Sequence, residues 1–573
     1  MIRNILENSI KTALWELKID KSNPVINLEH PEDLSHGDYS TNIAMVLAKQ
    51  VAQNPRELAE KIIVEIKERL PKEISKIEVA GTGFINFYLS GEFFISQSKE
   101  ILKVGEKFGI NKNLKGQKFL IEHTAPNPFK EFHIGHLMNN AVGESITRII
   151  KANGATVKTV GYHGDIGLHV AKTIWWMAND KKVNDFDSFS LIEKIKYLSK
   201  AYANGDNAYV NLDAKEKIEE INKKIYDKSD KEINKLYQKG RKASLDYLES
   251  LYKTLGSHFD HQFYETETVD VSKKIVLDFL KKGIFEESEG AVVFKGEKYG
   301  LHTRVFINKF GIPTYEAKEV GLAELKRKYF KYDKSLTVVA NEQDSFFDVV
   351  EVAIGEVFSE LKGKIKHISH GFLKLPSGKM SSRTGTIIST ETLIGDTKEM
   401  VLKKIVDREF DDKEKQKIAE MIAIGAIRYA ILHQAIGTDI IFDFDKSISF
   451  EGDSGPYLQY SYARAKSILR KAKEERVKPN VECRMSNSEQ NSLEKLLYRF
   501  PEIVERAGNE YSPHYIATYL IELASSFNSF YATGKIVDKK DAESPYKVAL
   551  TEAFSIVLKN GLNLLGIQAP EKM

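Results

Sequence analysis

Two histidines on either side of a glycine, in the run His133-Ile134-Gly135-His136, carry side chains suited to nucleotide chemistry. They precede a pattern of helical period, so they lie where free N–H groups and the positive end of a helix dipole attract an anion. Gly135 lets a purine ring pack on the backbone, and two imidazoles can donate hydrogen bonds to phosphate oxygens. Alone, the tetrapeptide is explained equally well by two hydrogen-bonded histidines at a helix start.

A second run, Gly378-Lys379-Met380-Ser381-Ser382-Arg383-Thr384-Gly385, is small, polar and basic, and follows the strand-like residues 367–375. Its small residues would let a loop close over a triphosphate, whose charge Lys379 and Arg383 would neutralise. A solvated basic turn is the commoner explanation for such a run in isolation.

The elements that must position these residues form one local pattern. A strand is predicted at 119–121, a helix with one apolar face at 137–152 and a second strand at 156–162, with Gly154 at a helix C-cap position. This order predicts a βαβ unit, and therefore a parallel sheet with a ligand crevice beyond its strand ends.

The rest of the chain predicts an α/β protein with a Rossmann-like parallel-sheet catalytic domain, helical insertions, a small α/β N-terminal domain and an all-α C-terminal bundle. The expected boundaries are residues 1–95 for the N-terminal domain, 110–400 for the sheet domain, about 180–255 for a charged helical insertion, 400–445 for a helical connection and 446–573 for the bundle.

The amino-acid composition limits the partners and the cellular location that can be expected for this protein. The 84 Lys and Arg against 81 Asp and Glu leave a net charge of +3, so any nucleic-acid surface must be a local patch. The single cysteine, Cys483, cannot form an internal disulfide or a Cys-rich zinc site, which favours a cytoplasmic location. No stretch reaches 18 uninterrupted apolar residues, so neither export nor membrane insertion is expected.

Together, the two runs resemble the HIGH and KMSKS signatures of class I aminoacyl-tRNA synthetases. The resemblance to arginyl-tRNA synthetases extends over nearly the whole chain. It is carried by Gly37-Asp38-Tyr39-Ser40-Thr41-Asn42, Gly83-Phe84-Ile85-Asn86-Phe87, Ala125-Pro126-Asn127, Lys130-Glu131-Phe132, His163-Gly164-Asp165-Ile166-Gly167 and Gly455-Pro456-Tyr457. It implies that a monomer binds ATP with Mg²⁺, L-arginine and tRNA(Arg), with an N-terminal domain for the tRNA elbow and a C-terminal anticodon-binding bundle.

The resemblance also implies roles for individual residues. The catalytic group would be Lys130, His133, His136, Lys379 and Arg383. ATP would be bound by His133, Gly135, His136, Lys379, Met380, Ser381 and Ser382. Arginine would be bound by Ala125, Pro126, Asn127, His136, Tyr315, Glu319 and Gln343. No metal site and no structural zinc are expected in the protein itself.

Several positions depart from the family pattern. Ser382 replaces the second lysine of KMSKS, and Lys130, three residues before HIGH, is similar to a lysine that supplies the missing charge in many members. Glu319 is longer than the aspartate expected four residues after Tyr315, where a bidentate pair with a guanidinium would form. Phe346 stands where His or Tyr is common, and Ile166 and His169 replace the tryptophan and glutamine of G-D-W-G-x-Q.

Three alternatives remain at this stage. Another class I synthetase is one, although the cysteinyl type would need cysteines that this chain lacks. A small HxGH nucleotidyltransferase is the second, and it would leave the N-terminal unit and the helical C-terminus unexplained. The third, a catalytically silent tRNA-binding paralogue, conflicts with the intact His133, Gly135, His136 and Lys379.

Overall fold

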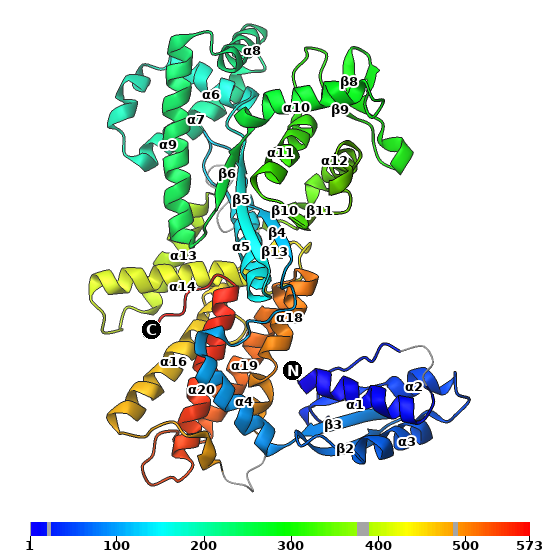
Figure 1. Ribbon diagram of the computed structural model, residues 1–573. Coiled ribbons are helices and arrows are strands. Elements are labelled where there is room, and N and C mark those ends of the chain that lie inside the picture. Colours follow the sequence, from blue (N-terminus) through cyan, green and yellow to red (C-terminus); the bar gives the residue numbers. More distant parts are fainter. Residues whose placement is uncertain (1, 20–23, 375–388, 485–490) are drawn as a thin grey trace.

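A five-stranded parallel sheet lies at the centre of the protein (Figure 1). The computed structural model describes residues 2–19, 24–374, 389–484 and 491–573. The sheet has the order β11-β10-β4-β5-β6, and every neighbouring pair is parallel. Its strands are β4 (Lys118–Glu122), β5 (Thr156–His163), β6 (His261–Tyr264), β10 (Lys334–Ala340) and β11 (Ile365–His370).

Helix α5 (Ile134–Ala152) connects β4 to β5, which confirms the predicted parallel α/β class. Most of α5 is buried, because the sheet covers one side and helices from the C-terminal part cover the other. The chain adds β5 and β6 on one side of β4 and then returns to place β10 and β11 on the other. The strand order therefore reverses between β4 and β10, where ligands of open α/β sheets bind.

Two long segments leave the sheet on either side of this reversal point. Between β5 and β6 the chain forms α6 (Leu168–Asn179), α7 (Leu191–Ala208), α8 (Leu212–Asp227) and α9 (Lys231–Leu255). Between β6 and β10 it forms α10 (Glu265–Leu280), the antiparallel strands β7 (Glu286–Ser288), β8 (Ala291–Phe294) and β9 (Arg304–Ile307), and α11 (Tyr315–Tyr329). The two segments stand apart above the carboxyl ends of the strands (Figure 1).

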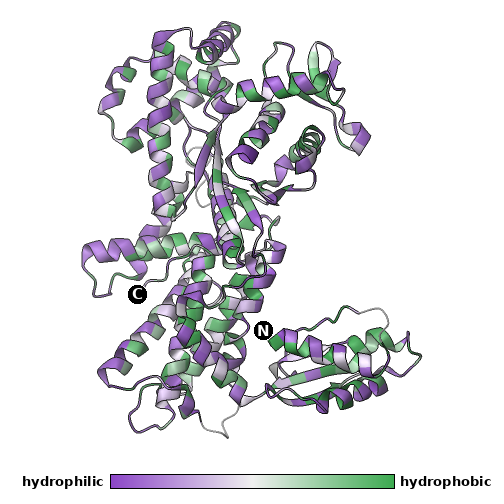
Figure 2. Cartoon of the chain, viewed as in Figure 1, coloured by the Kyte–Doolittle hydropathy of each residue, from purple (hydrophilic) through white to green (hydrophobic). Residues whose placement is uncertain are grey.

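The C-terminal part is helical, as predicted. Its long helices are α14 (Asp412–Leu432), α16 (Gly455–Glu474), α18 (Phe500–Glu510), α19 (His514–Ala532) and α20 (Ser544–Leu564). Apolar faces of these helices turn toward one another and polar faces turn outward (Figure 2). Helix α4 (Gly91–Val104) packs against α20 and α17 (Ser492–Leu497), so a blue helix lies among orange and red ones in Figure 1.

The N-terminal unit combines α1 (Ile2–Glu16), α2 (Ile43–Ala48) and α3 (Pro55–Lys67) with the antiparallel sheet β1 (Tyr39–Thr41), β3 (Phe84–Leu89) and β2 (Ile74–Ala80). It docks on the C-terminal helices through Tyr498, which packs in its apolar core, and through Glu502, which is hydrogen-bonded to Tyr39 and 3.3 Å from His30. None of the described helices is long and apolar enough to cross a membrane.

Candidate active site

Segments that carry predicted site residues follow the carboxyl ends of the parallel strands. Residues 123–133 follow β4, the turn 164–167 follows β5, and Glu265 follows β6. The 3-10 turn Asn341–Gln343 follows β10. Because all five strands are parallel, these ends lie along one edge of the sheet. Backbone topology alone therefore brings together residues more than 200 positions apart.

His133 and His136 form a reciprocal cap at the start of α5. Nδ1 of His133 accepts a hydrogen bond from the backbone N–H of Gly135 at 3.1 Å, and Nδ1 of His136 accepts one from the N–H of His133 at 3.3 Å. The two rings stack with their centroids 3.7 Å apart. A Cβ on Gly135 would lie 3.0 Å from the His133 ring, so glycine keeps this arrangement open.

Both imidazoles are neutral hydrogen-bond donors at neutral pH. Burial, followed by the charge of Lys130, lowers the pKa of His133. Burial, followed by the charges of His133 and Lys130, lowers the pKa of His136 well below its ordinary value. Since each Nδ1 accepts from the backbone, the single ring proton is on Nε2. Two Nε2–H groups are thus available to an anionic oxygen.

The chain on both sides of the second signature meets the first signature. Ser389 and His133 form an isolated antiparallel bridge, and the Thr390 N–H donates to the Phe132 carbonyl at 2.8 Å. On the upstream side, His370 is hydrogen-bonded through Nε2 to the Asn139 side chain on α5. The predicted residues Lys379, Met380, Ser381, Ser382 and Arg383 lie outside the described residues.

The loop before the first signature is strained. Thr124, Ala125 and Phe129 have φ values of 77°, 32° and 70°, a region that residues with a Cβ rarely adopt. The Asn127 side-chain oxygen would lie 2.4 Å from a Cβ at position 164, so Gly164 lets the amide rest on the backbone. The Pro126 carbonyl accepts a hydrogen bond from Nδ1 of His163 at 3.1 Å. The turn after β5 thereby fixes residues 126 and 127.

Tyr315 and Glu319 lie one helical turn apart on α11, and two buried ion pairs adjoin them. Lys318 pairs with Glu265 at 2.5 Å. Lys326 pairs with Glu122 at 2.6 Å. The charges of both pairs act on Glu319, which has no ion-pair partner within 4.0 Å among the described residues. Each of the other two carboxylates is matched by a lysine, so among these three carboxylates Glu319 alone has no paired cation in the described part of the chain.

The unpaired side chain of Glu319 favours the neutral, protonated form more than an ordinary glutamate does. Burial, followed by the charge of Glu122, raises the pKa of Glu319 to about 8. A bound guanidinium would favour the ionised form and supply the missing positive charge. Tyr315 is 59% exposed, and the charge of Glu265 is the second cause, after burial, that raises its pKa.

The structure also shows where Gln343, Phe346 and Lys130 lie. Gln343 is exposed at the carboxyl end of β10. Phe346 packs on the apolar core beside α11, with the Arg304 guanidinium 5.5 Å from its ring centroid. Lys130 approaches Tyr202 of the helical insertion. The sequence interpretation missed Glu122, Glu265 and their lysines, although a glutamate directly at the end of an apolar strand was a usable signal for Glu122.

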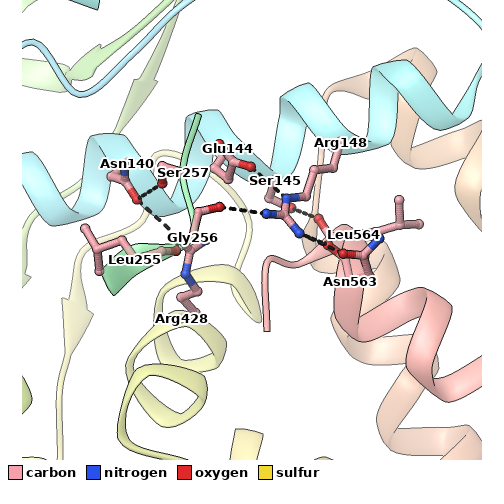
Figure 3. Close-up of polar contacts among 10 residues, drawn as sticks. All are labelled: Asn140, Glu144, Ser145, Arg148, Leu255, Gly256, Ser257, Arg428, Asn563 and Leu564. Carbon is pink, nitrogen blue, oxygen red and sulfur yellow. Dashed lines mark hydrogen bonds and ion pairs between the residues drawn. The ribbon is translucent and has the colours of Figure 1, made fainter. Parts of the chain in front are cut away.

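Helix α5 is anchored at its far end by Arg148 (Figure 3). This guanidinium donates to Glu144 at 2.7 Å, to the Gly256 carbonyl at 2.9 Å and to the carbonyl and side-chain oxygens of Asn563 at 2.9 and 2.8 Å. Ser145, beside it, donates to the Leu564 carbonyl at 2.9 Å. The first signature and the end of α20 are thus joined through a single helix.

A second guanidinium, that of Arg428, contacts the middle of α5 from a neighbouring helix. Arg428 of α14 is 1% exposed and donates to the Leu255 carbonyl at 2.7 Å and to the Asn140 side chain at 3.2 Å. Ser257 donates to the same Asn140 oxygen at 3.0 Å (Figure 3). Three other parts of the chain, the end of α9, α14 and α20, therefore meet around α5, the helix that begins with the candidate site.

Comparisons with known proteins agree with this arrangement. The family model "tRNA synthetases class I (R), catalytic domain" matches residues 97–444, "Arginyl tRNA synthetase N terminal domain" matches 3–89, and "DALR anticodon binding domain" matches 458–573. The sheet with its paired histidines at the strand-order reversal places the chain among the class I aminoacyl-tRNA synthetases.

Within that class, the chain belongs to the arginyl-tRNA synthetase family. It is 31% identical to an arginine–tRNA ligase of Thermococcus sibiricus, covering 100% of this chain and 98% of that protein. A ligase of the same name from Fusobacterium nucleatum is 33% identical, over 94% and 93% of the two chains. The Thermus thermophilus arginyl-tRNA synthetase shares the fold, with a TM-score of 0.80 at 24% identity over 100% of both chains.

Proposed function

We propose that this chain is an arginine–tRNA ligase. The arginine carboxylate attacks the α-phosphorus of ATP, which forms arginyl-adenylate and releases pyrophosphate. A ribose hydroxyl of the 3′-terminal adenosine of tRNA(Arg) then attacks the arginyl carbonyl and displaces AMP. No covalent enzyme intermediate is needed, so catalysis consists of positioning the reactants and stabilising charge.

ATP is proposed to bind at the start of α5. The Nε2–H groups of His133 and His136 would donate to phosphate oxygens as charge develops, and Gly135 would let the adenine approach the backbone. The second signature, through Lys379, Met380, Ser381, Ser382 and Arg383, would complete the ATP site. The contact between Ser389 and His133 supports this. Mg²⁺ would accompany ATP, since the phosphates supply most of its oxygen ligands.

Arginine is proposed to bind between α11 and the loop after β4. Its guanidinium would form a bidentate pair with Glu319 and a hydrogen bond with Tyr315, while Asn127 and Gln343 hold the α-amino and carboxylate end. Ala125, Pro126 and His136 would line the reacting end. The observation that carries this proposal is the unmatched, half-buried carboxylate of Glu319 beside two matched ion pairs.

The tRNA is proposed to span the whole molecule. Its elbow would contact the N-terminal domain of residues 1–95, its 3′ end would enter the catalytic domain of residues 110–400, which carries the insertion at about 180–255, and its anticodon would meet the helices of residues 446–573. Residues 400–445 would connect the last two. We propose that the protein acts as a monomer in the cytoplasm.

The test is exchange of labelled pyrophosphate into ATP, with each of the twenty amino acids, in the presence and absence of tRNA. We expect exchange with arginine alone among the amino acids, and only when tRNA(Arg) is present. Exchange with another amino acid would contradict the assignment of the pocket. Tight tRNA binding without exchange or charging would instead support the catalytically silent paralogue.

A further inference from the structure

Lys130 is held by an aromatic ring of the helical insertion. Its Nζ lies 4.0 Å from the ring centroid of Tyr202 on α7. One turn earlier on the same helix, the Ser199 hydroxyl accepts a hydrogen bond from the backbone N–H of Glu131 at 2.8 Å. Helix α7 therefore contacts two consecutive residues, Lys130 and Glu131, of the loop that leads into the first signature.

The nearest acidic group is already occupied by another lysine. Asp206, four residues after Tyr202, pairs with Lys172 at 2.6 Å, and Lys172 also lies 4.3 Å from the ring centroid of Tyr209. In the part of the chain that the structure describes, no carboxylate oxygen is within 4.0 Å of the Lys130 ammonium. The charge of Asp206 acts on Lys130 only from beyond that distance, without forming an ion pair, and the charge of Lys130 acts in turn on both His133 and His136.

An aromatic partner and a carboxylate partner would have opposite consequences for catalysis. Both restrict a lysine side chain that carries about 2 kcal/mol of rotamer entropy. A carboxylate would also neutralise the ammonium and compete with a phosphate for it. An aromatic ring attracts the cation through its quadrupole, by roughly 0.5–2 kcal/mol, and leaves the full positive charge available.

We propose that Tyr202 is a positioning residue for Lys130, whose ammonium it presents, still charged, to the triphosphate of ATP. This inference rests on the function proposed above and adds the insertion helix α7 to the apparatus that binds ATP. It also gives a physical reason for Ser382 to stand in place of a lysine: Lys130 supplies the replacement charge, and helix α7 holds it in place.

The test uses tRNA-dependent pyrophosphate exchange and compares kcat/KM for ATP with KM for arginine. Tyr202→Phe keeps the ring, and we expect less than a twofold change. Tyr202→Leu removes the ring, and we expect kcat/KM for ATP to fall by roughly 2- to 30-fold with an unchanged KM for arginine. Tyr209→Leu is the matched control at the residue that follows the end of α7, and it should leave both parameters unchanged.

A double-mutant cycle and a fluorination series distinguish positioning from simple packing. In a Lys130→Met background, Tyr202→Leu should have no further effect, since the ammonium is gone. Phenylalanine, 4-fluoro- and 3,4,5-trifluorophenylalanine at position 202 keep the shape while weakening the quadrupole, so kcat/KM for ATP should fall stepwise. This series applies even if Tyr202→Leu folds poorly.

Each outcome is decisive. Additive effects of the Lys130 and Tyr202 substitutions, a flat fluorination series, or an equal rise in KM for arginine would overturn the positioning role. Failure of the underlying function looks different: the unsubstituted protein itself would then show no arginine- and tRNA-dependent exchange, before any substitution at position 202 is considered.

Discussion

Ser389 is the backbone bridge partner of His133, so the chain returns to the first signature directly after residues 375–388. The adjoining hydrogen bond from Thr390 to Phe132 fixes this contact at 2.8 Å. The two histidines, for their part, are oriented by backbone groups and do not need a ligand to order them.

The first prediction concerns these histidines. His133→Ala and His136→Ala should each lower kcat for arginine-dependent pyrophosphate exchange by about 10²–10³-fold, the usual effect of removing one donor to a charge that develops in the transition state. KM for arginine should change little. The measurement is steady-state exchange with saturating tRNA, and thermal melting checks the fold. Full activity of the His136→Ala variant would contradict the assigned role.

The second prediction follows from Glu319. Because its pKa is raised to about 8, the carboxyl is mostly protonated at pH 7 and must ionise to bind a guanidinium. Arginine binding should therefore release close to one proton, seen as a dependence of the calorimetric enthalpy on the ionisation enthalpy of the buffer. Citrulline, which is uncharged, should release none.

Glu319→Gln supplies the matched variant for the same titration. It should abolish proton release and raise KM for arginine by roughly 10²-fold, since a charge-assisted pair with the ligand is lost. Identical enthalpies for the unsubstituted protein in all buffers would show that Glu319 is not the group that titrates on binding.

Much of the fold could be predicted because the signals are local. The βαβ unit was predicted from the period of residues 119–162, and the structure confirms both strands and α5. The helical C-terminal part follows from continuous 3.6-residue periodicity in the same way. Docking of the N-terminal unit was not predictable, because it depends on Tyr39 and Glu502, which are 463 positions apart.

The candidate site shows the same difference between features with a local sequence signal and features that depend on distant contacts. Its signature residues were found from short motifs, and their individual roles stay predictions. The ion pair of Glu265 with Lys318 and that of Glu122 with Lys326 join residues from separate elements, so no periodicity reveals them. The positive φ of Thr124 and Ala125 was equally hidden, since neither residue type favours that backbone region.

The third prediction is a pH dependence of stability. His123 is fully buried, and burial, its largest cause, lowers its pKa to about 4 from an ordinary value of 6.5. The unfolded state therefore takes up a proton near pH 6.5, while the folded state resists protonation until about pH 4. The contribution of His123 to the free energy of unfolding is fully present above its unfolded-state pKa of 6.5 and is lost as the pH falls below that value. Between pH 7.5 and 5 this loss is about 2 kcal/mol.

The measurement is urea unfolding of His123→Leu beside the parent protein, both carrying Trp15→Phe so that Trp175 and Trp176 report the catalytic domain. The difference in unfolding free energy between the two proteins should shift by about 2 kcal/mol across this pH range, in favour of the leucine variant at low pH. A constant difference would mean that His123 does not resist protonation in the folded state.

The last prediction concerns the link between α5 and α20 (Figure 3). Arg148 donates to two oxygens of Asn563, at the carboxyl end of α20, and also pairs with the buried Glu144. Arg148→Met leaves that carboxylate without its partner and removes a cation from a helix C-terminus, which should cost about 3–5 kcal/mol. Because α5 begins with His133, kcat for aminoacylation should fall more than KM for arginine rises.

Lys253→Met is the control for this variant, since Lys253 lies near the same junction but is 4.0 Å from its partner Glu249, with both side chains exposed. It should change the melting temperature and activity very little. Asn563→Ala removes only the side-chain acceptor, keeps the carbonyl, and should cost about 1 kcal/mol. Equal melting temperatures for the Arg148 and Lys253 variants would mean that the Arg148 contacts do not help to hold the two helices together.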